Sequence, residues 1–241
     1  MYPLRGSFAP HCHYHVTTKE YAKAYQNSLA LHTQQNPKDI LINRKSLTLS
    51  LAPLEFVVAH QIHSDRVEVV NRSIGWYEES ALECDGLITN QKNLVLTILT
   101  ADCVPILLHD PIQQAIGAVH AGWRGTKAHI VAKTIEAMQR EFGTNPKDTL
   151  AYIAPSIGKC CYEVGEDVAK YFEEDSYTQK GDKFRLDLPY LNAQQLLAMG
   201  VAQENITHSH ICTACEVERF FSYRQECGCD GRFMSMVWME S

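Results

Sequence analysis

The chain has 241 residues and a formal net charge of −6, and 45% of its residues are hydrophobic whereas 21% are charged. This composition is typical of a globular protein with a substantial core, and the absence of a basic block excludes nucleic acid as an expected partner. Because no apolar run approaches the roughly 20 residues that span a bilayer, and the N-terminus lacks the apolar core of a secretory signal, we expect a cytoplasmic protein with no membrane partner.

Short runs rich in Val, Ile and aromatic residues predict strands. In chain order they cover residues 56–59, 67–70, 94–99, 104–109, 115–120, 150–154, 208–212, 220–223 and 233–238. Helical patterns cover residues 40–51, 127–142, 165–172 and 188–199. Because the strands outnumber the helices and come in groups, and no linker or repeat divides the chain, the sequence predicts one α+β domain over residues 1–241 with a mixed sheet.

Cysteine and histidine are unusually frequent, with nine and eleven residues respectively. An odd number of cysteines excludes complete disulfide pairing within one chain, and a reducing compartment favours metal-binding or catalytic thiols over bridges. For any single cysteine, the simpler expectation is a small buried hydrophobic residue.

Three segments place a soft ligand beside an apolar run: QIH ends at His63, TADCVP contains Cys103, and VHAGWRG contains His120. One predicted strand, a turn at Asp110-Pro111 and a second predicted strand separate Cys103 from His120. An antiparallel hairpin would therefore bring these two residues together. His63 comes from further away, and its proximity does not follow from the spacing.

Two imidazoles and one thiolate can hold a zinc ion with a fourth position left open, and such an ion lowers the pKa of bound water to about 7. The same residue types also suit copper, or a nucleophilic thiol activated by imidazole. The simpler alternative is that Cys103 fills the core and that His63 and His120 are ordinary hydrogen-bonded side chains. Ligand chemistry alone leaves these alternatives open.

The candidate substrate contacts centre on the turn after His120. Gly122 and Gly125 flank Trp123-Arg124 between a predicted strand and a predicted helix, and a glycine-rich turn at a helix N-terminus favours anions. Arg124 would add charge-assisted bonds to a phosphate or carboxylate. Arg44 is a second candidate for anion contact. The alternative is a structural turn with Trp123 packed in the core.

Two acidic residues are candidates for proton transfer. Asp102 precedes Cys103, so on a strand its side chain would point to the opposite face. It would then shuttle a proton, or instead orient the turn or a histidine ligand. Asp85, in Cys84-Asp85-Gly86, is an alternative acid or a simple turn residue.

Further thiols raise the question of a second metal. Cys212-x-x-Cys215 and Cys227-x-Cys229 could form a structural zinc site, but CxC is a less usual half-site, and we expect unliganded thiols. Cys160-Cys161 is predicted to be structural. The N-terminal residues include His11, Cys12, His13 and His15, which could bind a metal. We predict instead that this segment is a mobile tail.

The order of the motifs QIHSDRV, TADCVPILLHDP, AVHAGWRG, IAPSIGKCCYEVGEDV and FFSYR, followed by Gly231-Arg232, resembles one family. This is the laccase-domain family, whose members are described as multicopper polyphenol oxidases, purine nucleoside phosphorylases and peptidoglycan editing factors. Matching segments run from about Asn43 to the C-terminus, which leaves residues 1–42 as a divergent N-terminal segment. One departure is Ser64, where the family often has glycine.

The resemblance implies a single domain with a mixed β-sandwich core and flanking helices. It also implies a zinc ion held by His63, Cys103 and His120. We predict a catalytic site made of these three residues and Asp102. Arg44, Asp85, Gly122 and Arg124 are then the candidate substrate-binding residues. The oligomeric state, monomer or homodimer, stays open.

The main functional prediction from this resemblance is a zinc-dependent enzyme acting on small-molecule substrates. It would phosphorolyse adenosine, inosine, guanosine or methylthioadenosine, with deamination of adenosine as a related activity. The alternatives are an amide hydrolase that edits peptidoglycan precursors, a copper polyphenol oxidase, and a zinc-binding module without turnover.

Overall fold

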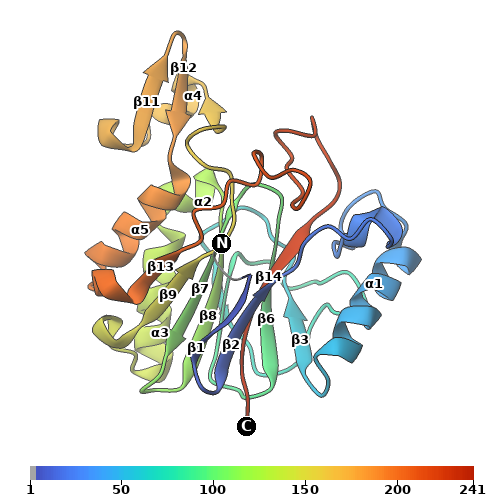
Figure 1. The fold of residues 1–241 in the computed structure, drawn as a ribbon. Helices are drawn as coiled ribbons and strands as arrows, with labels where there is room; N and C mark the ends of the chain where they lie inside the picture. Colours follow the sequence, from blue (N-terminus) through green and yellow to red (C-terminus); the bar gives the residue numbers. More distant parts are fainter. Residues whose placement is uncertain (1–3) are drawn as a thin grey trace.

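The structure is a computed structural model and describes residues 4–241 (Figure 1). One sheet has five strands in the order β1 (Arg5–Ala9), β2 (Cys12–Val16), β14 (Phe233–Met239), β6 (Leu94–Thr100) and β3 (Glu55–Val58). A second has six in the order β13 (Ile206–His208), β9 (Leu150–Ile153), β7 (Val104–Asp110), β8 (Ala115–Ala121), β5 (Gly86–Thr89) and β4 (Val67–Val69). A small third sheet contains β10 (Glu163–Val164), β12 (Lys183–Leu186) and β11 (Tyr177–Lys180).

Helices flank the two large sheets. They are α1 (Pro37–Ser50), α2 (Trp123–Lys127), α3 (Ile130–Phe142) and α5 (Leu188–Ala198), whereas α4 (Glu166–Ala169) lies beside the small third sheet. Short 3₁₀ turns lie at Ala24–Asn27, Pro146–Asp148, Glu174–Ser176 and Gln203–Asn205. Figure 1 shows α1 on one side of the strands and α3 and α5 on the other. None of the helices over residues 4–241 is long and apolar enough to cross a membrane.

Alternating side chains explain why the sheets are buried on both faces. On β6, Leu96 and Ile98 join the core between the two large sheets, whereas Val95 and Leu99 pack in the cluster that includes Leu47 of α1. Successive side chains on a strand point to opposite faces, so one apolar run fills two layers of core. Parallel pairs, such as β3 with β6, occur beside antiparallel ones. The predicted α+β fold with mixed sheets and flanking helices is confirmed.

Most predicted elements are present, with shifted ends. The predicted helix over residues 127–142 is divided, because His129 has a left-handed φ of 60° immediately before α3. The strand predicted at 208–212 lies earlier, at Ile206–His208. The prediction of a strand at 220–223 is wrong, because this segment contains a bend and a turn and no strand. Phe220 and Phe221 instead enter the core between the large sheets.

The prediction of a mobile N-terminal tail is also wrong. Residues Cys12–Val16 form β2, which pairs antiparallel with β14 from the opposite end of the chain. Cys12 and Tyr14 are buried while His13 and His15 are only half-buried. This alternation in CHYHV is the period-two signal of a strand.

The segment from Thr100 to Val104 connects the two large sheets. It leaves β6 in the five-stranded sheet and enters β7 in the six-stranded sheet. Asp102 has a φ of 93° at this crossing, a conformation that non-glycine residues rarely adopt. The acid and thiol of TADCVP therefore mark a change of sheet rather than the middle of a strand.

Candidate metal centre

His63, Cys103 and His120 lie together, and one ligand atom of each is within 4.8 Å of the others. The Nε2 atom of His63 is 3.9 Å from Sγ of Cys103. The two imidazole rings are nearly perpendicular, with their centroids 4.8 Å apart. His120 is buried, Cys103 is half-buried and His63 is exposed, so the cluster opens to solvent on the His63 side.

The predicted hairpin positions two of the three residues. Strands β7 and β8 pair antiparallel, with Val104 opposite Ala121 and Pro105 opposite His120. Cys103, immediately before β7, therefore lies beside the end of β8. His63 arrives from a loop after β3 and has a left-handed φ of 59°, which turns the chain toward the hairpin.

Asp85 holds both histidines in place. Its Oδ1 atom accepts hydrogen bonds from the His120 ring at Nδ1, at 2.7 Å, and from the His63 backbone N–H, at 3.0 Å. Its Oδ2 atom accepts from the backbone N–H and the hydroxyl of Ser64, at 2.6 and 2.7 Å. Asp85 is 1% exposed, so this carboxylate acts as a positioning group beneath the cluster rather than as a surface contact.

Gly122 allows the ligands to approach each other. A Cβ atom at this position would lie 3.0 Å from Cδ2 of His63 and 3.1 Å from Sγ of Cys103. Both distances are shorter than ordinary contact, so a methyl group would push the imidazole or the thiol outward. The glycine that the sequence offered as a substrate contact thus shapes the cluster itself.

Charges within the cluster shift two pKa values. Burial opposes the charged forms, but the Cys103 thiolate and the Asp85 carboxylate raise the pKa of His120 to about 9. Burial likewise disfavours the thiolate, yet the imidazoles of His120 and His63 lower the pKa of Cys103 to about 6. Without a metal, the pair therefore favours a thiolate beside an imidazolium at neutral pH.

The donor set fits a metal ion. With Nδ1 of His120 directed at Asp85, its Nε2 atom is free to act as a ligand beside the Cys103 thiolate, and such carboxylate–histidine pairs commonly orient metal ligands. Two imidazoles and one thiolate leave a fourth position of a tetrahedral zinc site open. Of the metal-ligand clusters among residues 4–241, this is the one that contains histidine.

The Asp102 carboxylate is engaged by hydrogen-bond donors from other loops. Its Oδ1 atom accepts from the Thr213 hydroxyl and its Oδ2 atom accepts from the Arg224 backbone N–H, both at 2.7 Å. The Ile157 backbone N–H donates to its carbonyl at 2.9 Å. These contacts tie two distant connections, the one after β9 and the one between β13 and β14, to the crossing between the sheets.

A cavity of about 480 Å³ opens beside the cluster. Besides the three candidate ligands and Asp102, its walls carry three arginines, Arg124, Arg224 and Arg232, and three large aromatic residues, Trp123, Tyr162 and Tyr223. Arg224 and Arg232 were not predicted as site residues, although FFSYR and Gly231-Arg232 contain them. Their position within those motifs is the sequence signal that could have identified them as site residues.

The two arginines predicted as anion contacts lie in different surroundings. Arg124 is at the cavity wall, 4.3 Å above the Trp123 ring, and within the described part of the chain its guanidinium has no hydrogen-bond or ion-pair partner. Arg44 is 1% exposed and donates to the carbonyls of Leu29, Gly75 and Trp76 at 2.7–2.8 Å. Arg44 is not among the residues that line the cavity, and its contacts are structural.

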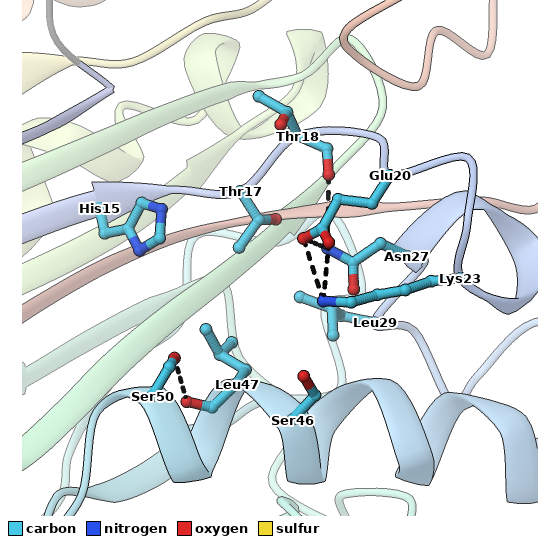
Figure 2. A pocket seen from close by; sticks show the side chains of 10 residues that line it. All are labelled: His15, Thr17, Thr18, Glu20, Lys23, Asn27, Leu29, Ser46, Leu47 and Ser50. Carbon is cyan, nitrogen blue, oxygen red and sulfur yellow. Dashed lines mark hydrogen bonds and ion pairs between the residues drawn. The ribbon is translucent and has the colours of Figure 1, made fainter.

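A second pocket lies between the N-terminal segment and α1 (Figure 2). Its charged groups are already paired with each other, since Lys23 Nζ and the Asn27 amide both contact the Glu20 carboxylate at 2.9–3.0 Å. Leu47 and two serines of α1 form the opposite wall. None of the metal-ligand clusters found among residues 4–241 lies in this pocket.

Comparisons with known proteins identify the family of the chain. The signature of the family described as multi-copper polyphenol oxidoreductase laccase matches residues 13–240. A Bacillus subtilis protein named purine nucleoside phosphorylase YlmD is 34% identical over 224 residues, which is 87% of this chain and 81% of the relative. Escherichia coli purine nucleoside phosphorylase YfiH is 32% identical over 219 residues, 88% of this chain and 86% of the relative.

Solved structures show the same fold. The crystal structure of Bacillus licheniformis hypothetical protein YfiH matches with a TM-score of 0.90 at 32% identity, covering 99% of this chain and all of that one. YlmD from Geobacillus stearothermophilus matches with a TM-score of 0.89 at 30% identity, covering 97% of this chain and 94% of that one. Because the family signature spans nearly the whole sequence and the named relatives exceed 30% identity, the chain belongs to the multi-copper polyphenol oxidoreductase laccase family.

Proposed function

We propose that this protein is a zinc-dependent purine nucleoside phosphorylase. The observation that carries the proposal is the cluster of His63, Cys103 and His120 at a cavity whose walls also present arginines and aromatic rings. Relatives named purine nucleoside phosphorylase indicate the reaction class. In that reaction, a phosphate oxygen attacks C1′, the bond from C1′ to the purine nitrogen breaks, and ribose 1-phosphate and the free base are released.

The arginines of the cavity wall are proposed to bind the phosphate. Arg124 stacks on Trp123, and this leaves its N–H groups available to an incoming anion. Arg224 and Arg232 are partly engaged with backbone carbonyls, so they contribute mainly positive potential at the wall. Charge-assisted bonds from a guanidinium to a phosphate are among the strongest polar contacts in proteins, and Arg124 is therefore the primary phosphate contact in this proposal.

The aromatic wall suits the purine. Tyr162 and Tyr223 each lie beneath a guanidinium, at 5.3 Å from Arg224 and 5.9 Å from Arg232. Flat rings favour stacking with a flat heterocycle, and stacking does not read a single exocyclic group. For this reason we propose that inosine, guanosine and methylthioadenosine are accepted together with adenosine.

Asp85 and Gly122 position the proposed zinc ligands. Asp85 fixes the His120 ring and the His63 backbone, and Gly122 keeps the ligands close. A zinc ion bound there would supply a Lewis acid that polarises an oxygen at its open position. The cluster provides ligands for a single ion, which favours a mononuclear zinc centre over a multicopper oxidase.

A phosphate-dependence assay tests the proposal. Purified protein, its metal content measured, is incubated with adenosine with and without inorganic phosphate, and adenine, inosine and hypoxanthine are separated. Adenine and ribose 1-phosphate are expected only when phosphate is present. Deamination of adenosine would instead give inosine without phosphate, because water is then the attacking group.

Matched cysteine variants assign the activity to the cluster. Cys103→Ala is expected to abolish adenine release, whereas Cys227→Ala removes an exposed thiol elsewhere and is expected to keep it. An absence of purine products from zinc-loaded wild type, or equal turnover by both variants, would contradict the proposal. Copper in place of zinc with oxidation of a phenol would support the oxidase alternative.

A further inference from the structure

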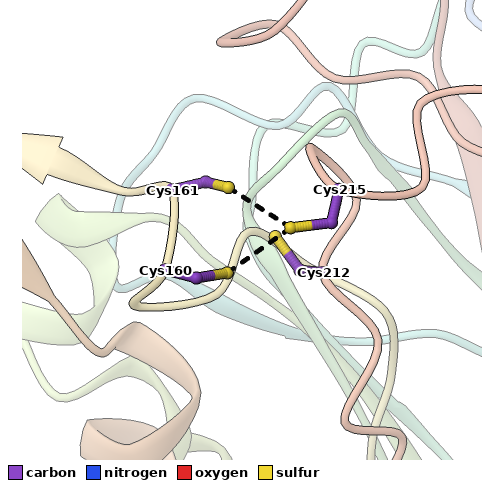
Figure 3. Close-up of side chains that lie close together, drawn as sticks. All are labelled: Cys160, Cys161, Cys212 and Cys215. Atoms are coloured by element: carbon purple, nitrogen blue, oxygen red, sulfur yellow. Dashed lines mark hydrogen bonds between the residues drawn. The ribbon is translucent and has the colours of Figure 1, made fainter.

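Four cysteines converge on the surface next to the cavity (Figure 3). The sulfur atoms of Cys160, Cys161, Cys212 and Cys215 all lie within 4.8 Å of one another. Sγ of Cys215 is 3.6 Å from Sγ of Cys160 and 3.4 Å from Sγ of Cys161. All four are free thiols, and these separations are well beyond the roughly 2.05 Å of a disulfide bond.

The backbone assembles this four-cysteine cluster from two loops far apart in the sequence. Ser156 and Cys212 form a parallel bridge, and the Thr213 N–H donates to the Ser156 carbonyl at 3.0 Å. Within each loop a tight turn brings the thiols together: the Cys161 N–H donates to Gly158 at 2.9 Å, and the Glu216 N–H donates to Cys212 at 3.0 Å. The convergence is therefore fixed by backbone hydrogen bonds and not by the sulfurs themselves.

Gly158 contacts two cysteines of the four-cysteine cluster. Its backbone N–H donates to Sγ of Cys212 at 3.3 Å, which is a contact that favours a thiolate. A Cβ atom on Gly158 would lie 3.3 Å from Sγ of Cys160 and 3.4 Å from Cβ of Cys212. A side chain here would therefore require the Cys160 thiol to shift by a few tenths of an ångström, whereas glycine leaves the thiols where they are.

We propose that Cys160, Cys161, Cys212 and Cys215 bind one structural zinc ion. Four thiolates around zinc at about 2.3 Å form a tetrahedron whose corners are about 3.8 Å apart, and the sulfur separations in the four-cysteine cluster are of this size. An iron–sulfur cluster needs wider spacing, because its thiolates bind different iron atoms. All-thiolate sites are typical of structural zinc, since no position is left for water.

The sequence had grouped these thiols differently. The spacing indicates Cys212 and Cys215 together with Cys227 and Cys229 as a possible site but predicts unliganded thiols, and it predicts that Cys160-Cys161 is structural. The structure retains the CxxC half and replaces the CxC half with the adjacent pair from the other loop. The two loops are 51 or more residues apart, so no local spacing could show this pairing.

This zinc would act on the candidate active site through the loops that it joins. Tyr162, next to Cys161, lines the cavity, and Thr213, next to Cys212, donates to Asp102 at the crossing between the sheets. Ile157 donates from the other loop to the Asp102 carbonyl. The ion would therefore hold one wall of the cavity in place without contacting substrate.

Zinc counting in variants tests the site independently of catalysis. In a His63→Ala/Cys103→Ala protein, which lacks the histidine-containing cluster, one zinc per chain is expected to remain. X-ray absorption at the zinc edge of that protein should show four sulfur ligands at about 2.3 Å. No bound zinc in this folded variant, or a first shell containing nitrogen or oxygen, would overturn the proposal.

Cysteine pairs provide the matched comparison. Cys212→Ser/Cys215→Ser in the wild-type background is expected to lose one zinc per chain, while Cys227→Ser/Cys229→Ser, which removes the same number of thiols outside the cluster, is expected to lose none. If the first variant does not fold, the zinc count of the His63→Ala/Cys103→Ala protein decides the question. Mass spectrometry that finds a disulfide among the four cysteines of freshly purified protein would also refute the proposal.

Discussion

The Nδ1 atom of His120 lies 2.7 Å from Oδ1 of Asp85, and the same carboxylate accepts hydrogen bonds from the backbone N–H groups of His63 and Ser64. One buried acid thus sets the ring orientation of one candidate ligand and the backbone position of another. Because both contacts use the acceptor capacity of a carboxylate, an amide of the same shape cannot replace it.

Asp85→Asn is expected to weaken zinc binding at the site of His63, Cys103 and His120 by about 10- to 100-fold. This is the usual effect of losing the hydrogen-bond partner of a histidine ligand. The amide nitrogen cannot accept the bonds that one carboxylate oxygen now accepts. Competition with a chromophoric chelator measures the affinity. Asp65→Asn, which removes an equal charge from a neighbouring aspartate paired with Lys133, should leave the affinity unchanged, and an equal loss in both variants would contradict this role.

In chelator-treated protein, alkylation of Cys103 is expected to follow a midpoint near pH 6. The direction follows from the lowered pKa of about 6: the reactive thiolate prevails above that pH and is lost as the pH falls below it. Rates read for the Cys103 peptide by mass spectrometry give the profile. His120→Ala removes the neighbouring imidazole and should move the midpoint up toward the ordinary thiol value of about 8.5; an unmoved midpoint would exclude His120 as the cause.

Asp102→Asn is expected to lower the free energy of unfolding by about 1–3 kcal/mol, the range for losing a hydrogen bond to a buried charge. Only one of its two acceptor contacts, with Thr213 or with Arg224, survives in the amide. Urea unfolding of this variant, of Thr213→Val and of the double variant measures the coupling between the two side chains. A fall in kcat of about 10²- to 10⁴-fold with unchanged stability would instead indicate proton transfer.

Arg44→Met is expected to destabilise the protein by about 3 kcal/mol or more, because three buried carbonyls lose their donor. Thermal unfolding is the measurement, with the exposed Arg72→Met as control. The folded fraction of the Arg44 variant should keep its KM for phosphate, since this guanidinium does not line the cavity. A raised KM would restore Arg44 as a substrate contact.

The sequence by itself determined the ligand types and the local pairing that unites two of them. Cys103 and His120 are joined by two short strands and a turn, so their approach depends on local chain geometry that apolar runs and turn residues encode. The order of strands along the chain was likewise sufficient to predict an α+β domain.

Only the tertiary structure decided which distant segments meet. His63 reaches the hairpin because Asp85 holds its loop, β2 pairs with β14 across the whole chain, and the loop of Cys160 and Cys161 meets that of Cys212 and Cys215. Each of these contacts depends on how the two large sheets pack, and packing is a property of the entire core. Residue spacing therefore identified the candidate ligands, whereas the stacking of the sheets determined their partners.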